Sequence, residues 1–392
     1  MKNRYMLFID FDGTITANDV GYELFKKFTN GDTEADVRLY REAKLNSREC
    51  LLRECDIWNK HAPSQRNVYN YLDRQALSPG FREFLRFLDF IDLQPVILSE
   101  GFDFYIDRVL ASHHLSHLER ITNIAVFEIN FLTPQFPYYE LGCKECSNCK
   151  GYHIGQLRPP KISAIYIGDG HSDLHASRQA DIVFAKSHLK ALLETDKRYF
   201  IEYNNFFDIA GELKRLLNNG IFVESQRIDL CFVDHRHHES WQRLWESADV
   251  MRHVGYPAGL GWNQARYDAL WERLAEKTDA IHLAIEDKTG VFMGEAMISF
   301  PDADGFCRHD VKLLPEFQHR GFGQKTWKII LDRAKARWPL AHALVTPAVE
   351  NIRAIEMYRR LGFEFDGGPM IWAPPAEKLN SVPVTFRRMT KI

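Results

Sequence analysis

Three short runs of β-branched and other apolar residues in the first half of the chain each end in a loop of polar residues. These runs are Tyr5–Ile9, 93–98 and 164–167, and longer stretches with helical periodicity separate them. Strands that alternate with helices predict a parallel sheet, and open sheets of this kind bind ligands at the carboxyl ends of their strands. The sequence therefore predicts an α/β fold in which three loops converge on one site.

The length of the chain predicts a second domain, because a single core rarely grows beyond about 250 to 300 residues and the chain has 392. Residues 19–80 carry apolar side chains at helical spacing, which predicts a helical cap over the first site. An Asn-Asn-Gly sequence at 218–220 then marks a helix stop and a turn. The expected parts are a first domain at 1–217, a linker at 218–226 and a second domain at 227–392.

The second half has a different order of elements. Helical patterns at 241–251 and 264–277 precede β-rich runs at 280–286, 291–300 and 308–314. This order predicts a mixed α/β domain, and the sequence contains no internal repeat.

Charge and cysteine content narrow the class of function. The formal net charge of -3, with no long run of Lys and Arg, argues against nucleic-acid binding. The apolar run Tyr5–Ile9 is too short for a signal-peptide core or a membrane span, so we expect a cytoplasmic protein without membrane contact. Seven scattered cysteines, an odd number, fit a reducing compartment better than a disulfide scaffold.

The loop after the first apolar run places two carboxylates, Asp10 and Asp12, directly behind a strand. A phosphate monoester resists hydrolysis because an anionic nucleophile must approach an anionic phosphoryl group, and a bound Mg²⁺ neutralises that charge and aligns the attack. Asp169 and Asp173, after the third run, are hard oxygen ligands suited to Mg²⁺. A strand-end hydroxyl, a glycine that permits close backbone approach and a cation complete the set: Ser99, Gly101 and Lys150.

These segments together resemble the haloacid dehalogenase superfamily, and most of all its phosphoserine-phosphatase-like branch, which includes phosphatases of methionine salvage. An Asp-x-Asp-x-Thr loop, a strand-end Ser or Thr, a Lys and an acidic Gly-Asp loop occur in that order over roughly residues 5–217. The resemblance implies a Rossmann-like core with a helical cap, an aspartyl-phosphate on Asp10, Asp12 as acid and then base, and a small phosphorylated metabolite as substrate. It also implies two sets of ligands: Thr14, Ser99, Gly101 and Lys150 for the phosphoryl group, and Asp10, Asp12, Asp169 and Asp173 for Mg²⁺.

Three closely spaced cysteines and a nearby histidine offer soft or borderline ligands for a structural Zn²⁺: Cys143, Cys146, Cys149 and His153. The spacing lacks a second separated pair, so the cysteines could equally be reduced thiols in a loop that presents Lys150. Lys144 and Lys161 also lie near the position expected for the phosphate-binding lysine. We favour Lys150 because of its Cys-Lys-Gly context.

In the second half, a strand at 311–315 leads into a glycine-containing loop at 318–323 and then into a helical stretch at 324–336. Glycines let backbone N–H groups approach a pyrophosphate, and a helix N-terminus adds partial positive charge. Further on, Tyr358 lies in a helical pattern that Gly362 ends. Tyr358 can thus point toward a bound thioester.

These two segments resemble the GCN5-related N-acetyltransferase family over about residues 227–392. The resemblance implies that acetyl-CoA is the cofactor, that Asn351 contacts its pantetheine side, and that Tyr358 protonates the departing thiolate during transfer to a small amine. Glu295 or Glu350 could accept the proton of the amine through water. Backbone contacts at Leu313 and Leu314 and pyrophosphate contacts at five loop residues complete the implied site: Gln318, Arg320, Gly321, Gly323 and Gln324. Three neighbouring histidines are interpreted as a solvated turn and not as a metal site: His235, His237 and His238.

We therefore predict a bifunctional enzyme that hydrolyses a small phosphomonoester and acylates a small amine, on one compound or on pathway-adjacent compounds. Two alternatives stay open. The second domain could bind CoA and only regulate the phosphatase, or the enzyme could act on a substrate bound to a carrier protein in natural-product assembly. The identities of both substrates and the length of the acyl chain are not readable from the sequence, and a homodimer is neither required nor excluded.

Overall fold

The structure, a computed structural model, describes residues 5–217, 223–225, 227–233, 235–276, 280–338, 341–373 and 381–391. Its two compact units are the residues up to 82 together with 92–209, and residues 83–91 together with the chain from 210 onward. Helices α5 (Phe81–Ile91) and α10 (Phe206–Leu217) span this division. Much of the predicted linker lies outside the described residues, and the predicted domain limits therefore stay predictions. No helix within the described ranges is long and apolar enough to cross a membrane.

The first unit is built on a seven-stranded sheet. In spatial order its strands are β4 (Phe131–Gln135), β3 (Glu119–Glu128), β2 (Pro95–Phe102), β1 (Tyr5–Ile9), β5 (Ser163–Gly168), β6 (Ile182–Ala185) and β7 (Ile201–Glu202). All neighbouring strands are parallel except β3 and β4. Leu7, Phe8 and Ile9 of the central strand β1 are fully buried. The prediction of a parallel α/β sheet is confirmed.

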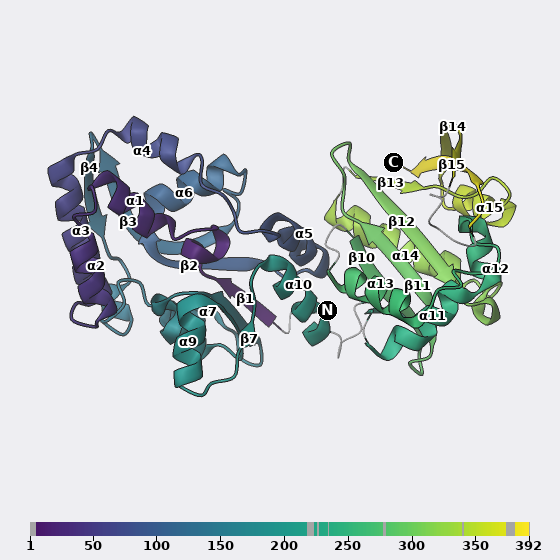
Figure 1. The fold of residues 1–392 in the computed structure, drawn as a ribbon, viewed down its shortest axis with the longest axis horizontal. Helices are drawn as coiled ribbons and strands as arrows, with labels where there is room; N and C mark the ends of the chain where they lie inside the picture. Colours follow the sequence, from purple (N-terminus) through teal and green to yellow (C-terminus); the bar gives the residue numbers. More distant parts are fainter. Residues whose placement is uncertain are drawn as a thin grey trace. The chain divides into compact units, whose positions relative to one another are not determined.

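Four helices lie in the region predicted as a cap: α1 (Val20–Phe28), α2 (Glu34–Arg41), α3 (Ser47–His61) and α4 (Gln65–Leu72). Figure 1 shows α1, α2 and α3 grouped beyond the end toward which β1 points. Helix α3 begins at a capping box, in which the side chains of Asn46 and Glu49 each accept the backbone N–H of the other residue. Its Trp58 is fully buried against Phe25 of α1 and Phe127 of β3. These aromatic contacts anchor the helices to the sheet.

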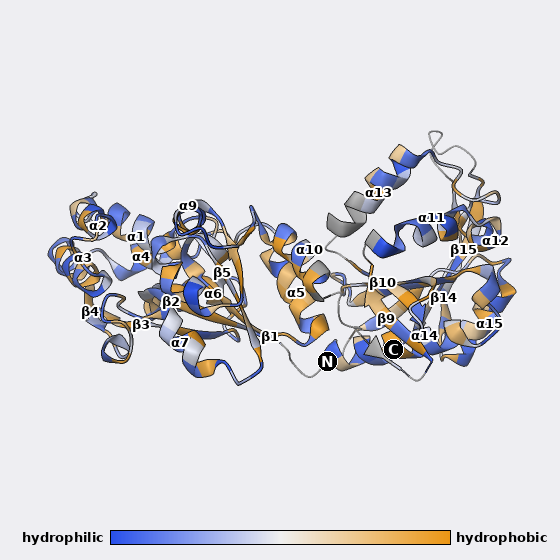
Figure 2. Ribbon diagram, turned by 90° about the horizontal axis from the view of Figure 1, so that it is seen from below, coloured by the Kyte–Doolittle hydropathy of each residue, from blue (hydrophilic) through white to orange (hydrophobic). Residues whose placement is uncertain are grey.

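The remaining helices of the first unit are α6 (Asp103–Ser112), α7 (Lys150–Leu157), α8 (Leu174–Gln179) and α9 (Ser187–Thr195). Figure 2 shows mostly hydrophobic residues along β2 and β5, whereas α2 and α3 are largely hydrophilic. Strands of a parallel sheet that is covered on both faces are hydrophobic along their whole length. Helices of a cap are more hydrophilic because one face of each helix contacts water.

The second unit is built on an eight-stranded sheet. In spatial order its strands are β14 (Glu364–Trp372), β15 (Val384–Lys391), β13 (His342–Val345), β12 (Phe306–Leu313), β11 (Phe292–Ser299), β10 (Ala280–Asp287), β9 (Ile228–Phe232) and β8 (Val223–Glu224). Its helices are α11 (His238–Glu246), α12 (Ala248–Met251), α13 (Gln264–Glu276), α14 (Phe322–Arg337) and α15 (Ile352–Arg360). The prediction of a mixed α/β domain is confirmed. The helix expected at 241–251 is broken, because Ser247 has an extended backbone between α11 and α12.

Strands β12 and β13 form the one parallel pair among the described strands of this sheet, over Phe306 to Arg308. From His309 to Leu313, β12 is registered with β11 on its other side and no longer with β13. The end of β12 that leads into the glycine loop therefore has a sheet neighbour on one side.

His309 on β12 is buried, and neither ring nitrogen has a hydrogen-bond partner in the described part of the chain. Burial lowers the pKa of His309 to about 3, whereas histidine in an unfolded chain titrates near ~6.5. Between pH ~6.5 and pH 3, the His309 side chain binds a proton in the unfolded protein but not in the folded one. The free energy of unfolding therefore falls as the pH is lowered from ~6.5 toward 3. When the pH is lowered from about 7 to about 5.5, the free energy of unfolding measured in urea should fall by about 1.3 kcal/mol more in wild type than in His309→Phe. Equal losses in both proteins would contradict this prediction.

Candidate functional site

The carboxylates of Asp10, Asp169 and Asp173 form a cluster at the carboxyl ends of β1 and β5, where their oxygens lie within 4.8 Å of one another. Asp10 directly follows β1 and is 4% exposed, and its N–H donates to Ile167 O at 2.9 Å. Asp169 follows β5 and accepts a hydrogen bond from Thr14 Oγ1 at 3.0 Å. Burial and the charge of Asp173 raise the pKa of Asp169 to about 6. Parallel strands thus bring together acidic residues from opposite ends of the domain.

Lys150 is the cation of this cluster. Its Nζ donates to Asp10 Oδ1 and to Asp173 Oδ1, both at 2.5 Å, and its side chain is buried. Although burial alone lowers it, the two carboxylates raise the pKa of Lys150 well above its usual value, so the amine stays protonated. The alternatives Lys144 and Lys161 are both exposed. The structure therefore brings Lys150 to Asp10, as favoured from the sequence.

Asp173 accepts hydrogen bonds from four donors. These are Lys150 Nζ at 2.5 Å, the Tyr166 hydroxyl, and the N–H groups of Asp169 at 2.9 Å and Gly170 at 2.8 Å. A carboxylate with so many partners mainly orients its neighbours. Direct metal ligation by Asp173 stays a prediction.

The Asp12 carboxylate has a separate set of contacts, on the side of the cap. Oδ1 accepts from Gly21 N at 2.9 Å, and Oδ2 accepts from the Tyr105 hydroxyl at 2.6 Å and from Ser99 Oγ at 3.5 Å. Burial and the charge of Asp19 raise the pKa of Asp12 to about 7. This carboxyl group can therefore gain and lose a proton near neutral pH, while its predicted part in metal binding is not seen among the clustered oxygens.

Ser99 and Gly101 lie inside β2, which continues to Phe102 with an irregular register after Leu98, so the prediction that Ser99 stands at the end of its strand is wrong. Both residues lie beside Asp12. Gly101 N donates to Ser99 Oγ at 2.9 Å, and Asn148 Nδ2 donates to Ser99 O at 2.9 Å. A Cβ atom at Gly101 would clash with the Tyr105 hydroxyl, so glycine is required there. Gly101 thus holds the hydroxyl predicted to bind a phosphoryl oxygen, and Asn148 holds the backbone of the same serine.

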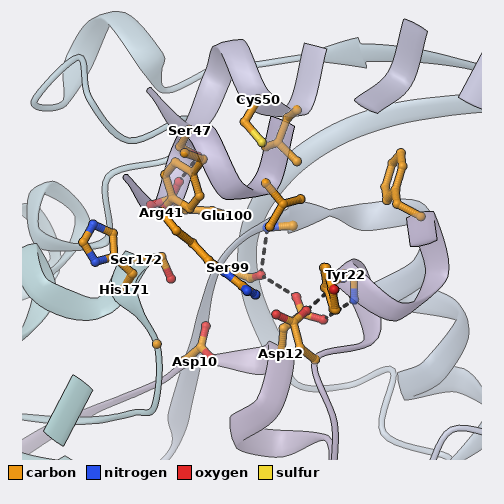
Figure 3. Close-up of a pocket in the computed structure, with 18 of the residues that line it drawn as sticks. Asp10, Asp12, Tyr22, Arg41, Ser47, Cys50, Ser99, Glu100, His171 and Ser172 are labelled. Atoms are coloured by element: carbon orange, nitrogen blue, oxygen red, sulfur yellow. Dashed lines mark hydrogen bonds between the residues drawn. The ribbon is translucent and has the colours of Figure 1, made fainter. Parts of the chain in front are cut away.

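A cavity of about 470 Å³ lies over these residues. Figure 3 shows Asp10, Asp12 and Ser99 at its floor and residues of the cap helices, including Ser47 and Cys50, on the opposite side. Small-molecule sites commonly have volumes of about 300 to 1,000 Å³. The cavity therefore has room for a metabolite-sized ligand above Asp10.

In the second unit, the glycine loop joins β12 to α14. Gly321 has a φ of +80° and directly precedes α14, which begins two residues before the predicted 324. Gln318 Nε2 donates to Leu313 O at 2.9 Å, and Leu314 N donates to Met293 O at 2.9 Å. These two backbone groups already have partners, so coenzyme contacts there stay predictions. Gly323 and Gln324 lie in the first turn of α14, where N–H groups can face an anion. Arg320 lies just before the N-cap Gly321.

Tyr358 lies on α15, 8% exposed, with its ring edge against Trp327 at a centroid distance of 5.1 Å. Burial, assisted by the charge of Asp310, raises the pKa of Tyr358, so its hydroxyl stays protonated. Asn351 Oδ1 accepts from Ala354 N at 3.1 Å and caps α15. The predicted acid is thus a protonated phenol, while Asn351 has a structural role beside its predicted coenzyme contact.

The two candidate bases differ in environment. Glu295 is 3% exposed, with His282 Nδ1 at 2.6 Å and Trp245 Nε1 at 2.9 Å from its oxygens. Although burial opposes it, His282 and the charge of Lys312 lower the pKa of Glu295 to about 2. A carboxylate of such low pKa is a poor proton acceptor at neutral pH. Glu350 is exposed.

The interpretation of the three histidines as a solvated turn is wrong at His237. Its side chain is 2% exposed, and Nε2 lies 2.7 Å from Glu286 Oε1 on β10. His238 lies 3.3 Å from Asp268, and the side chain of His235 is outside the described residues. The partner of His237 is 49 positions away in the chain, so local sequence carried no sign of it.

Comparisons with known proteins match the two units separately. Residues 7–178 match the model of haloacid dehalogenase-like hydrolases, and residues 240–363 match the acetyltransferase (GNAT) family. The 2-hydroxy-3-keto-5-methylthiopentenyl-1-phosphate phosphatase of Bacillus mycoides (strain KBAB4) is 30% identical over 218 residues, which cover 54% of this chain and 96% of that protein. The enzyme of the same name from Bacillus cereus (strain G9842) is 30% identical over 215 residues, with the same coverage.

The chain belongs to the haloacid dehalogenase-like hydrolases. It also carries a GNAT acetyltransferase domain, so it is an enzyme with a phosphatase domain and an acetyltransferase domain. Among solved structures, spermidine N-acetyltransferase from Vibrio cholerae in complex with CoA and spermine is 16% identical, with a TM-score of 0.36 and coverage of 43% of this chain and 96% of that one. A likeness of that size carries no conclusion about the acceptor.

One contributor to the hydrolase site and one residue of the cysteine group were missed in the sequence. Tyr105 is an aromatic residue in an ordinary helical pattern, and only the fold brings its hydroxyl to Asp12. His153, expected beside the cysteines, has Nε2 2.6 Å from Asn148 Oδ1. His175 instead lies within the cysteine group. Motif order could have found neither the contact of Tyr105 nor that of His175, because each joins segments that are distant in sequence.

Proposed function

We propose that the haloacid dehalogenase-like domain hydrolyses a small phosphomonoester with Mg²⁺, through an aspartyl-phosphate on Asp10. The observation that carries this proposal is the meeting of Asp10, Lys150 and Asp169 at the floor of the cavity of about 470 Å³. A phosphoryl group there meets a nucleophilic carboxylate, a protonated amine and the Ser99 hydroxyl. The similarity to phosphatases over the whole domain supports the same reaction.

Asp12 has the properties of the proton carrier in this proposal. In the first step, an Asp10 oxygen bonds to phosphorus, the bond from phosphorus to the alcohol oxygen breaks, and protonated Asp12 donates its proton to that oxygen. In the second step, the Asp12 carboxylate takes a proton from water as the water oxygen attacks phosphorus, which releases Asp10 and inorganic phosphate. A pKa of about 7 suits Asp12 for both directions.

The donor set of the cluster fits Mg²⁺, because carboxylate oxygens are hard ligands and few of them are needed. Asp10 and Asp169 would hold the ion, with Asp173 positioning Lys150 and the Asp169 loop. When bound, the ion would neutralise charge on the phosphoryl oxygens and align them.

The cavity favours a phosphate ester with an apolar end. Its lining includes the apolar side chains Phe25, Val37, Leu51 and Leu192. Burial and the charge of Asp19 raise the pKa of the lining residue Glu54 to about 8, so this carboxyl is mostly neutral at pH ~7. The relatives are named for 2-hydroxy-3-keto-5-methylthiopentenyl-1-phosphate, which we propose as a representative of the substrate class.

The test is release of inorganic phosphate from a panel of that ester, phosphoserine and other phosphorylated amines and amino acids. We expect kcat/KM to be highest for the ester with the apolar end. A preference for phosphoserine would overturn the substrate class alone. Absence of release from every member, with Mg²⁺ present, would overturn the phosphatase proposal.

For the GNAT domain we propose transfer of an acetyl group from acetyl-CoA to a small amine, on a compound of the same pathway as the phosphate ester. The loop 318–324 would bind the pyrophosphate, with N–H groups of the first turn of α14 and the exposed Arg320 as donors. Free CoA is measured with the same panel, and a compound positive in both assays supports the shared pathway. Calorimetric binding of acetyl-CoA without any acylated product would favour a regulatory domain instead.

Tyr358→Phe should lower kcat for acetyl transfer on the order of 10²-fold, because the departing thiolate loses its proton donor. The Michaelis constant for acetyl-CoA and the phosphatase activity should change little, since only the hydroxyl is removed. Tyr267→Phe, at a fully buried tyrosine of the same unit, is the control and should keep full activity. Unchanged acetyl transfer in Tyr358→Phe would remove Tyr358 from the proposed mechanism.

We also propose a cytoplasmic location, which the cysteines support. None of the seven forms a disulfide in the structure, and cysteines without disulfides are typical of a reducing compartment. A homodimer stays a prediction that light scattering can check.

A further inference from the structure

The loop that precedes Lys150 and the start of α8 bring four metal-binding side chains together. The ligand atoms of Cys143, Cys146, Cys149 and His175 all lie within 4.8 Å of one another. His175 Nδ1 is 3.1 Å from Cys146 Sγ and 3.6 Å from Cys143 Sγ. Two segments that are separated along the chain therefore converge on one point.

We propose that these four side chains bind one structural Zn²⁺. Tetrahedral Zn²⁺, with Zn–S bonds of about 2.3 Å and Zn–N bonds of about 2.0 Å, separates its ligand atoms by about 3.5 to 3.8 Å. The distances from His175 Nδ1 to the two sulfurs are already close to that spacing. Three thiolates and one imidazole in this arrangement select zinc among the common metals, and four protein ligands close the site to substrate.

The surroundings of the ligands are those of a metal site. The other ring nitrogen of His175, Nε2, faces Glu145 Oε2 at 3.8 Å, as a carboxylate commonly faces a zinc-bound histidine. Cys143 Sγ accepts the N–H of Cys146 at 3.3 Å. Cys149 stands at the N-terminus of α7, where the helix dipole favours a thiolate.

Close approach of the backbones supports the same conclusion. A Cβ atom at Gly142 would lie 2.5 Å from Cys149 Cβ, and one at Gly151 would lie 2.6 Å from His175 O. Glycine at both positions lets the cysteine loop fold onto itself and lets α7 contact α8. These close approaches hold the cysteine loop and the start of α8 beside each other.

The zinc site would hold the segments that build the floor of the phosphatase cavity. Cys149 directly precedes Lys150, and His175 follows Asp173 by two positions. In the same loop, Asn148 donates to Ser99 O at 2.9 Å, and Ser147 Oγ donates to Glu100 Oε2 at 3.1 Å. A metal that links the loop to α8 therefore positions the lysine and the hydroxyl proposed to bind phosphate, without touching the substrate.

The first test is the metal content of the full chain, purified without chelator under reducing conditions and measured by mass spectrometry of the elements. We expect about one Zn per chain. The Asp10→Asn protein should retain it, because the carboxylate cluster is a different site. A chain that holds no zinc, and binds none when Zn²⁺ is titrated against a competing chelator, overturns the proposal.

Variants locate the metal. Cys143→Ala, at an exposed cysteine, and His175→Ala should each bind Zn²⁺ at least about 10-fold more weakly than wild type. Cys55→Ala, at a buried cysteine outside the group, is the matched control and should bind it normally. Equal binding by Cys143→Ala and the control would overturn the proposed ligand set.

Replacement of zinc by Co²⁺ in wild type provides a readout that needs no variant. A tetrahedral site with three thiolates should give intense thiolate-to-cobalt charge-transfer bands and strong visible d–d bands. Weak bands typical of octahedral oxygen ligation would overturn the assignment. Neither metal content nor these spectra depends on phosphatase activity, so failure of this proposal and failure of the proposed function are distinguishable.

Discussion

Asp10→Asn is expected to lower kcat for phosphate release on the order of 10⁴-fold and to leave acetyl transfer unchanged. Asparagine keeps the shape of the side chain, but its amide oxygen is not an anionic nucleophile and cannot form the aspartyl-phosphate. The substitution also removes the charge that faces Lys150 at 2.5 Å. Inorganic phosphate and free CoA are measured on the same preparation, so that the activity of the unchanged domain serves as the reference for the quality of the protein.

Asp107→Asn is the matched control, because Asp107 is a half-exposed aspartate of the same domain, paired with Arg120. This variant should keep both activities. If Asp10→Asn retained phosphatase activity, the nucleophile would have to be another residue. If it lost both activities, the two sites would not be independent.

Lys150→Met is expected to lower the free energy of unfolding of the phosphatase domain by about 3 to 5 kcal/mol, because it leaves buried carboxylates without their counter-charge. Lys150 bonds to both Asp10 and Asp173, and all three side chains are nearly inaccessible to water. Phosphate release should fall by about 10² to 10³-fold, as is common when a fixed charge at a reaction centre is removed. Urea unfolding without added metal measures the first effect.

Lys144→Met is the control for this prediction. Lys144 lies close to Lys150 in the sequence and forms an ion pair with Glu140. The side chains of Lys144 and Glu140 are 66% and 75% exposed. The unfolding free energy of this variant should change by no more than about 0.5 kcal/mol, since exposed pairs contribute little. Equal destabilisation by both substitutions would show that Lys150 is not the counter-charge of the cluster.

Asp10 and Asp169 could be predicted because each directly follows a strand. The apolar runs before Asp10 and Asp169 indicated where β1 and β5 stop, and parallel strands place such ends along one edge of a sheet. The pairing of β1 with both β2 and β5 has that consequence. The same reasoning worked less well in the second domain, where a glycine loop and a tyrosine were recognisable but the proton acceptor was not.

The sequence by itself determined the strands that precede the motifs and the order of the motifs, because periodicity and turn chemistry depend on neighbouring residues. It did not predict four other strands of the first sheet: β3, β4, β6 and β7. Only the tertiary structure decided between Lys150 and the lysines near it, since the contact with Asp10 joins residues 140 positions apart. It also placed His175 and not His153 among the cysteines, and it buried His237 against Glu286. Such contacts depend on how helices pack against the sheets, and no local pattern encodes that packing.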